Sequence, residues 1–147
     1  MRDFPHHYVV SANAKAVSNV VLSANGVSDL ESAPPAEFGG PGDQWSPESL
    51  LIAAVADCFV LSFRAIARAS HLEWDSLNCE VEGILDRVDR VTQFVAFNVK
   101  ASVDIPSGTD EGKALHLLEK AEHACLITNS LKADSHLEAS VHVSKVE

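Results

Sequence analysis

A long apolar segment in the middle of the chain limits what this sequence can fold into. Residues 50–63 read LLIAAVADCFVLSF and are apolar on nearly every side of a helix, with Asp57 as their one charge. The preceding Ser-Pro-Glu (46–48) supplies a capping hydroxyl, a first-turn proline and an acid at the positive end of the helix dipole. We therefore expect a helix from Ser46 to about Ser70, covered on most sides at the centre of the fold.

The residues before this helix predict short strands followed by a folded loop. Segments 7–12, 15–23 and 27–31 are rich in β-formers, and Asn25-Gly26 suits a tight hairpin turn. Residues 33–46 hold three of the six prolines and three of the seven glycines, so they form an irregular loop. Its two aromatic side chains, Phe38 and Trp45, are expected to be buried.

The residues after the helix predict a hairpin, a second helix and a closing strand. Segments 77–85 and 92–105 alternate with period two around a turn at 86–90, which places Val95 and every second residue to Ile105 on the buried side. Asp110 can cap a helix over 111–124 that ends near Cys125, and residues 136–143 alternate again. The predicted fold class is α+β, as a single domain over residues 1–147.

Charge and composition exclude several classes of function. Eleven basic against 21 acidic residues give a net charge of −10, which disfavours nucleic acid as a partner. No uninterrupted apolar stretch reaches about 18 residues, and the first residues lack the apolar core of a signal peptide, so we expect a soluble, cytoplasmic protein without a membrane partner. Three cysteines are too few for a disulfide scaffold, and none lies within four residues of another, so no metal site is expected.

The three cysteines differ in what their surroundings allow. Cys58, inside the apolar helix, is either a small buried hydrophobe or a reactive thiol. Cys79 is in phase with its apolar strand neighbours and is expected in the core, whereas Cys125 ends an amphipathic helix where the chain meets solvent. His116 and His123 could each act as a base near Cys125, although a cation at the end of a helix also suits the dipole.

Two segments carry a resemblance to a known family. Residues 34–59, PPAEFGGPGDQWSPESLLIAAVADCF, resemble the signature of the OsmC/Ohr family (osmotically inducible protein C and organic hydroperoxide resistance protein). In that signature a Gly-rich loop leads into a Pro-Glu helix start, with a cysteine ten residues after the glutamate, here Glu48 and Cys58. Residues 121–133, AEHACLITNSLKA, are similar to the family's later cysteine segment, where Cys125 takes the cysteine position.

The resemblance implies a fold, an assembly and a reaction. It implies antiparallel sheets around a long buried central helix, in an intertwined homodimer with two equivalent sites at the interface. It also implies a cofactor-free thiol peroxidase that acts on organic hydroperoxides. Cys58 would attack the peroxide and Cys125 would resolve the resulting sulfenic acid as a disulfide. A dithiol of lipoyl or glutaredoxin-like type, or a small thiol, would then reopen the disulfide.

The charged groups around Cys58 depart from the family pattern. The family's glutamate pairs with an arginine from an early strand, but no arginine lies between Asp3 and Arg64, and the early turn offers only Lys15. Lysine lacks the bidentate fork of arginine, and the adjacent Asp57 disfavours a thiolate if both groups are dry. On one straight helix, Glu48 would also stand about 15 Å from its own Cys58.

These departures leave a second hypothesis open. The chain could be a dimeric OsmC-fold protein that binds an apolar small molecule or thiol with little or no peroxidase activity. The candidate pocket residues are Phe38, Trp45 and Phe59, which could equally be core aromatics. A metal-dependent hydrolase is a third and weaker alternative.

Overall fold

The computed structural model describes residues 2–144 and divides into two compact units, Met1–Leu51 and Ile52–Glu147. The division falls inside a helix, so each unit is described by itself. The expectation of a single domain over residues 1–147 stays a prediction.

The N-terminal unit contains a three-stranded antiparallel sheet in the order β1-β2-β3. Its strands are β1 (Ser11–Asn13), β2 (Val20–Ser23) and β3 (Leu30–Ser32). All three predicted strands are present but shorter than expected, because only these residues find a partner strand. Gly26 has a φ of 83° between β2 and β3, as the Asn-Gly turn predicts.

The loop after β3 is folded, as expected, but its aromatic side chains are not buried. It contains a 3-10 turn, η1 (Ala36–Phe38), and the backbone N–H of Ala33 donates to the Trp45 carbonyl at 2.8 Å. The exposed fractions of Phe38 and Trp45 are 58% and 47%, so the prediction of burial is wrong for the chain as described. Backbone hydrogen bonds, rather than aromatic packing, hold this loop.

Helix α1 (Pro47–Ala69) begins where the sequence predicts. Ser46 and Ser49 cap it reciprocally: Ser46 Oγ accepts from the Ser49 backbone N–H at 3.1 Å, and Ser49 Oγ accepts from the Ser46 N–H at 2.9 Å. Four residues at a spacing of four are buried, namely Val55, Phe59, Phe63 and Ala67. Burial on one stripe, rather than on most sides, corrects the prediction, since a single sheet can cover only one side of a helix.

The C-terminal unit contains the second sheet, in the order β4-β5-β6. Strands β4 (Ser76–Val88) and β5 (Val91–Ile105) form the predicted antiparallel hairpin, turned at Asp89 and Arg90 with positive φ. Strand β6 (Asp134–Val143) pairs with β5 in parallel, which corrects the expectation of purely antiparallel sheets. A helical crossover between β5 and β6 carries the chain back, so both strands run the same way.

A β-bulge shifts the inward face of the hairpin by one residue. Ile84 pairs with Ala96 but Leu85 pairs with Phe94, which leaves Val95 as the extra residue. The exposed fraction of Val95 is therefore 37%, and its predicted place on the buried side is wrong. Phe94 turns inward instead, with its ring centroid 5.4 Å from that of Phe97.

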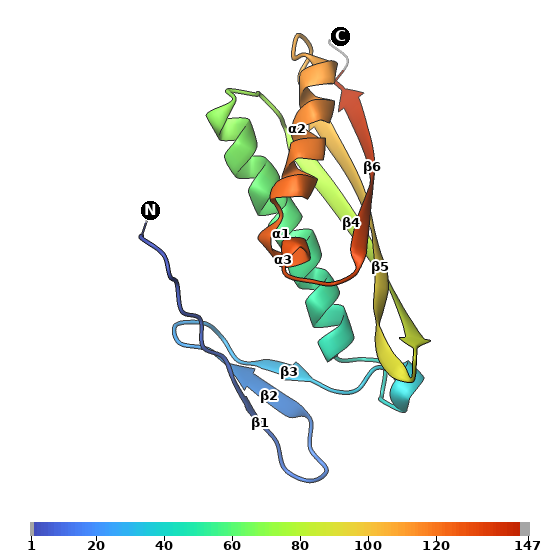
Figure 1. Ribbon diagram of the computed structural model, residues 1–147. Coiled ribbons are helices and arrows are strands. Elements are labelled where there is room, and N and C mark those ends of the chain that lie inside the picture. Colours follow the sequence, from blue (N-terminus) through green and yellow to red (C-terminus); the bar gives the residue numbers. More distant parts are fainter. Residues whose placement is uncertain (1, 145–147) are drawn as a thin grey trace. The chain divides into compact units, whose positions relative to one another are not determined.

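Helices cover one face of the second sheet (Figure 1). Helix α2 (Glu111–Ala124) is capped as predicted, because Asp110 Oδ1 accepts from the Lys113 backbone N–H at 3.2 Å. It packs against β5 and β6, and a short helix α3 (Leu126–Asn129) follows. The C-terminal part of α1 lies beside α2 on this face, where Phe63 meets Trp74 with ring centroids 5.3 Å apart.

Helix α1 is long and apolar enough to cross a membrane by length and composition, and it is the one such helix among the described residues. Asp57 interrupts its apolar run, in agreement with the sequence. The core helix of a soluble protein can have the same length and composition. The stripe packed in the C-terminal unit is that of a core helix, which is consistent with a soluble protein.

Gly83 of β4 lies against Ile52 of α1, which gives a test of this packing. A Cβ at Gly83 would overlap Ile52 Cδ1 and lie 3.0 Å from Phe94 Cε1. We predict that Gly83→Ala lowers the free energy of unfolding by about 1–3 kcal/mol through overpacking, measured by denaturant unfolding. Adding Ile52→Val should recover part of this loss, and equal loss in the single and double variants would contradict the packing shown.

Candidate functional site

Cys125 lies at the junction between α2 and α3 and is buried, with 2% of its surface exposed. Its backbone N–H donates to the Glu122 carbonyl at 3.3 Å, and its carbonyl accepts from the Asn129 N–H at 3.0 Å and from Thr128 Oγ1 at 3.1 Å. The polar residues after the cysteine thus turn the chain back rather than expose it. The expectation that this position meets solvent holds for the neighbouring residues but is wrong for the Cys125 side chain.

Cys58 lies in the middle of α1 and is half-buried, with its Sγ 3.9 Å from the Ser62 hydroxyl one turn later. It stands beside the buried stripe rather than in it. The hydroxyl can donate a hydrogen bond to a sulfur that carries negative charge. The position therefore combines partial access with one polar neighbour on the same helix.

The helical turn that carries Cys58 meets Cys125 in the core. Val55 and Phe59, on either side of Cys58 in α1, line a void with Cys125 and Val99 that is too narrow for a water molecule. Segments almost seventy residues apart in sequence therefore converge. The two cysteines predicted as a redox pair come from packed elements of one unit, and their disulfide stays a prediction.

Cys79 is the third free thiol, on the inward side of β4 opposite Ala101. Burial, and to a smaller degree the nearby Cys125, raises the pKa of the Cys79 thiol to about 11. A thiol with so high a pKa is almost wholly protonated at neutral pH and is a poor nucleophile. Its half-buried, in-phase position agrees with the core role expected from the sequence.

The predicted charged residues of the site lie in the N-terminal unit. Glu48 is in the first turn of α1, and its Oε1 is buried without a hydrogen-bond partner among residues 2–144. Lys15 is exposed between β1 and β2, where its backbone N–H donates to Ser18 Oγ at 2.8 Å. No ion pair joins the two within the described part of the chain, so a catalytic role for either stays a prediction.

The remaining candidates are spread over different environments. Phe59 is buried against Cys125, whereas Phe38 and Trp45 are exposed in the N-terminal unit, so a pocket formed by all three stays a prediction. Asp57 is exposed, which lets water screen its charge from the neighbouring Cys58. His116 and His123 are exposed on α2, and His123 lies in the last turn, as the capping interpretation requires.

Glu122 is a residue that the sequence analysis missed. It lines the same void as Cys125, and its Oε2 is buried without a hydrogen-bond partner in the described residues. Burial raises the pKa of the Glu122 carboxyl, and Glu119 adds to this, while His123 and His136 oppose it. A carboxylate three residues before a candidate thiol, in the last turn of an amphipathic helix, is the signal that could have found it.

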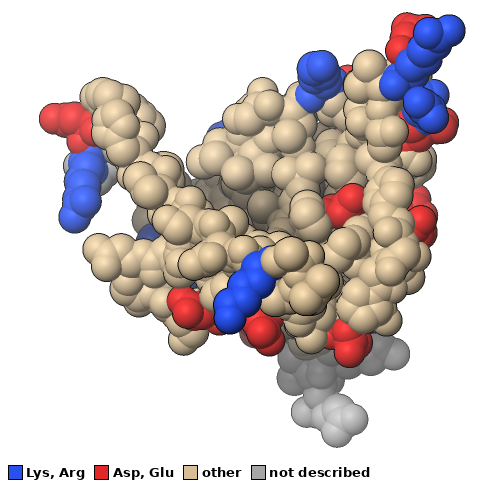
Figure 2. All heavy atoms as spheres, turned by 90° about the horizontal axis from the view of Figure 1, so that it is seen from below, with Lys and Arg blue, Asp and Glu red and all other residues tan. Residues whose placement is uncertain are grey.

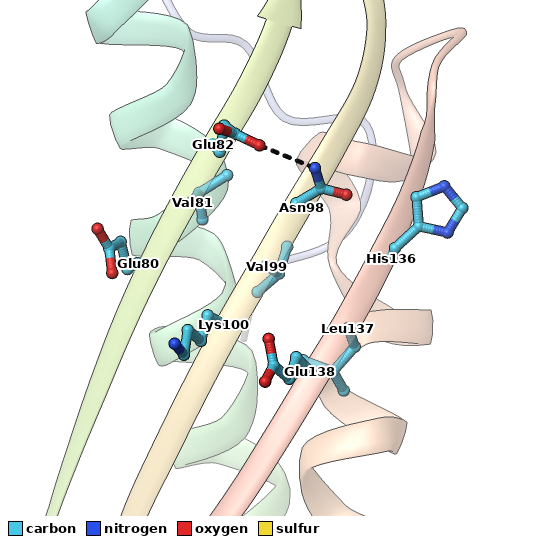
Figure 3. A pocket seen from close by; sticks show the side chains of 9 residues that line it. All are labelled: Glu80, Val81, Glu82, Asn98, Val99, Lys100, His136, Leu137 and Glu138. Carbon is cyan, nitrogen blue, oxygen red and sulfur yellow. Dashed lines mark hydrogen bonds between the residues drawn. The ribbon is translucent and has the colours of Figure 1, made fainter.

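The opposite face of the sheet is polar and carries no thiol (Figure 3). One row of charged side chains crosses the three strands, namely Glu80, Lys100 and Glu138. In the neighbouring row the Asn98 side-chain amide donates to Glu82 Oε1 at 3.0 Å. They border an open hollow of about 480 Å³. Charged side chains of both signs are also dispersed on the face drawn in Figure 2, without a continuous basic surface.

No group of three or more histidine, cysteine or acidic side chains that could hold a metal ion occurs in residues 2–144. Cys58 in α1 and Cys125 at the end of α2 make this a candidate dithiol site in an α+β fold.

The sequence model of the OsmC-like protein family matches residues 40–140, and the chain belongs to this family. It is 30% identical over 144 residues to the uncharacterized protein YmaD of Bacillus subtilis. The match covers 92% of this chain and 95% of YmaD. The family resemblance seen in the two cysteine segments is therefore confirmed.

Solved structures show the same fold. An OsmC-like protein of unknown function from Vibrio cholerae superposes with a TM-score of 0.79 at 19% identity, over 93% of this chain and 99% of that one. An organic hydroperoxide resistance protein OsmC from Legionella pneumophila gives 0.74 at 23% identity, over 95% and 99%. These matches establish the OsmC fold for this chain.

The raised pKa of Cys79 predicts slow modification of this thiol in the folded protein. A shift of two units leaves roughly a hundredfold less thiolate at neutral pH than the ordinary value of 9.0, partly offset by greater intrinsic nucleophilicity. We expect native alkylation by iodoacetamide at pH 8 to be at least tenfold slower at Cys79 than in the denatured chain, read by peptide mass spectrometry. Equal rates in the two states would contradict this environment.

The raised pKa of Glu122 predicts a pH dependence of stability. Between the ordinary carboxyl pKa of 4.5 and the raised value, the folded chain binds more protons at this site than the unfolded chain. The free energy of unfolding should therefore contain a contribution that falls as the pH rises through this window. Glu122→Gln should remove it, measured by urea unfolding from pH 4 to pH 8. Glu111→Gln, in the first turn of α2, is the control, and an unchanged slope in Glu122→Gln would count against the assignment.

Proposed function

We propose that the chain is a thiol-dependent peroxidase that reduces organic, fatty-acid-like hydroperoxides to alcohols. The observation that carries this proposal is the packing of the Cys58 turn of α1 against Cys125, through Val55 and Phe59. Family membership and a fold shared with an organic hydroperoxide resistance protein support it.

The reaction needs only the two thiols and a reductant. The Cys58 thiolate attacks the distal peroxide oxygen, the O–O bond breaks, and the alcohol leaves with a proton while Cys58 becomes a sulfenic acid. Cys125 then attacks the Cys58 sulfur, which forms the disulfide and releases water. A dithiol of lipoyl type, or a small thiol, reduces the disulfide by exchange. The half-buried Cys58 acts as the peroxide-reactive thiol and the buried Cys125 as the resolving one.

The proposal includes a homodimer in the cytoplasm. The C-terminal unit leaves much of the apolar surface of α1 uncovered, with Leu61 49% exposed, and a second copy would bury such a surface. Glu48 would then serve as the site carboxylate, held by a cation such as Lys15. The unpartnered Glu48 Oε1 supports this, because a buried carboxylate oxygen is stable only with a donor or a proton.

A second candidate is a dimeric OsmC-fold protein that binds an apolar small molecule with little peroxidase activity. The observation that favours it is the same Glu48 Oε1, for which the described residues supply no cation. Without that cation the site lacks the positive charge that would stabilise a peroxide-reactive thiolate.

Thiol counting separates the two candidates. After one equivalent of cumene hydroperoxide we expect the loss of two free thiols per chain, faster than with hydrogen peroxide, read by intact mass and thiol titration. Cys58→Ser should keep its remaining thiols, because it lacks the thiol that attacks the peroxide. Cys79→Ser is the matched control and should behave as the wild-type protein. Retention of all thiols in the wild-type protein would overturn the peroxidase and favour the binding protein.

A further inference from the structure

The side chain of Glu122 joins the Cys125 void to the surface. It lines the narrow void with Cys125, Val55 and Phe59. It also lines two open hollows beside β6, which share His123, Ser135 and His136. Among the residues that line the void, Glu122 is the one with a carboxyl group.

The buried end of this carboxyl is free to act on a proton. Glu122 Oε2 is buried and makes no hydrogen bond to residues 2–144. The backbone carbonyl of the same residue accepts a hydrogen bond from the Cys125 N–H. A buried oxygen without a donor is costly for a carboxylate and much less so for a protonated acid. The geometry thus suits a group that gains and loses a proton during a reaction.

The charged and titratable groups around Glu122 come from three elements. Helix α2 contributes Glu119 and His123, the segment before β6 contributes Lys132, and β6 contributes Asp134 and His136. Helix α1 presents only Val55 and Phe59 to the void. Figure 3 shows the His136 ring pointing away from β5, off the edge of the sheet. Two imidazoles thus line the open side of Glu122, and none of the described residues that line the void carries a cation.

We infer that Glu122 accepts the proton of the Cys125 thiol when this thiol closes the disulfide, and returns it to solvent through the hollows lined by His123 and His136. The inference rests on the proposed function. In the balanced step, Cys125–SH and Cys58–SOH give the S–S bond and one water. The S–H bond of Cys125 and the S–O bond of Cys58 break. Glu122 takes the thiol proton and releases it to solvent, and the hydroxide that leaves Cys58 takes one proton from solvent and becomes the water.

The test separates the first and second steps of a single turnover. In Glu122→Gln, sulfenic acid at Cys58 should form at the wild-type rate with cumene hydroperoxide, while disulfide closure slows by about tenfold or more at neutral pH. The pH profile of closure should lose its lower limb in the variant, and the two rates should converge at alkaline pH, where hydroxide can take the proton in place of Glu122. Glu122→Asp should recover part of the rate. Glu111→Gln, an exposed acid in the first turn of α2, should close like the wild-type protein.

A second route to the same closure step needs no peroxide. An aromatic disulfide reagent first forms a mixed disulfide at Cys58. Attack by Cys125 then forms the S–S bond and releases a coloured nitrothiobenzoate, while the thiol proton again goes to Glu122. We expect this second release to slow by the same factor in Glu122→Gln. Because the step bypasses the hydroperoxide, it tests Glu122 even if the wild-type protein forms no sulfenic acid, which would overturn only the peroxidase.

Slower disulfide closure in Glu122→Gln by either route, with loss of the lower limb of its pH–rate profile, supports the inference. Closure that keeps the wild-type rate and pH profile overturns it, as does equal slowing of both steps, which would indicate a structural role. Absence of closure in the wild-type protein by both routes would also overturn it.

Discussion

Burial of one stripe of α1 against the second sheet is the interaction on which the rest of the structure depends. Phe59 and Phe63 are almost wholly buried, and each such side chain contributes about 1.5–3 kcal/mol when removed from water. The stripe fixes the rotation of the helix. That rotation places Cys58 beside the core, and Val55 and Phe59 against Cys125. A different rotation would separate the two thiols that the proposed reaction requires.

The chain uses its three cysteines in three distinct environments. Burial suppresses Cys79 by raising its pKa, Cys58 keeps partial access and a hydroxyl neighbour, and Cys125 is held inside by a turn of backbone hydrogen bonds. A buried resolving thiol is protected from adventitious oxidants but must lose its proton in a place without water. Glu122 lines both the void and a surface hollow, and in the proposed mechanism its carboxyl accepts this proton.

The missing family arginine makes the Glu48 carboxylate the group that distinguishes the two candidate functions. Glu48 keeps its position at the start of α1, with a buried oxygen that needs a proton or a cation. The resemblance also assigns Cys58 and Cys125 to the family's two cysteine positions. The peroxidase and the binding protein therefore differ in whether a cation reaches this carboxylate, rather than in the fold.

The sequence by itself determined the helices, the long hairpin and the family. Capping residues such as Ser46 and Asp110, period-two alternation and the two cysteine segments are local signals, and local backbone and burial preferences are enough to express them. The tertiary structure decided the direction of β6, the bulge at Val95 and the exposure of Phe38 and Trp45. It also decided the meeting of Glu122, Cys125 and α1. These features depend on which distant segments pack together, and the pattern of residues along one strand or helix does not contain that information.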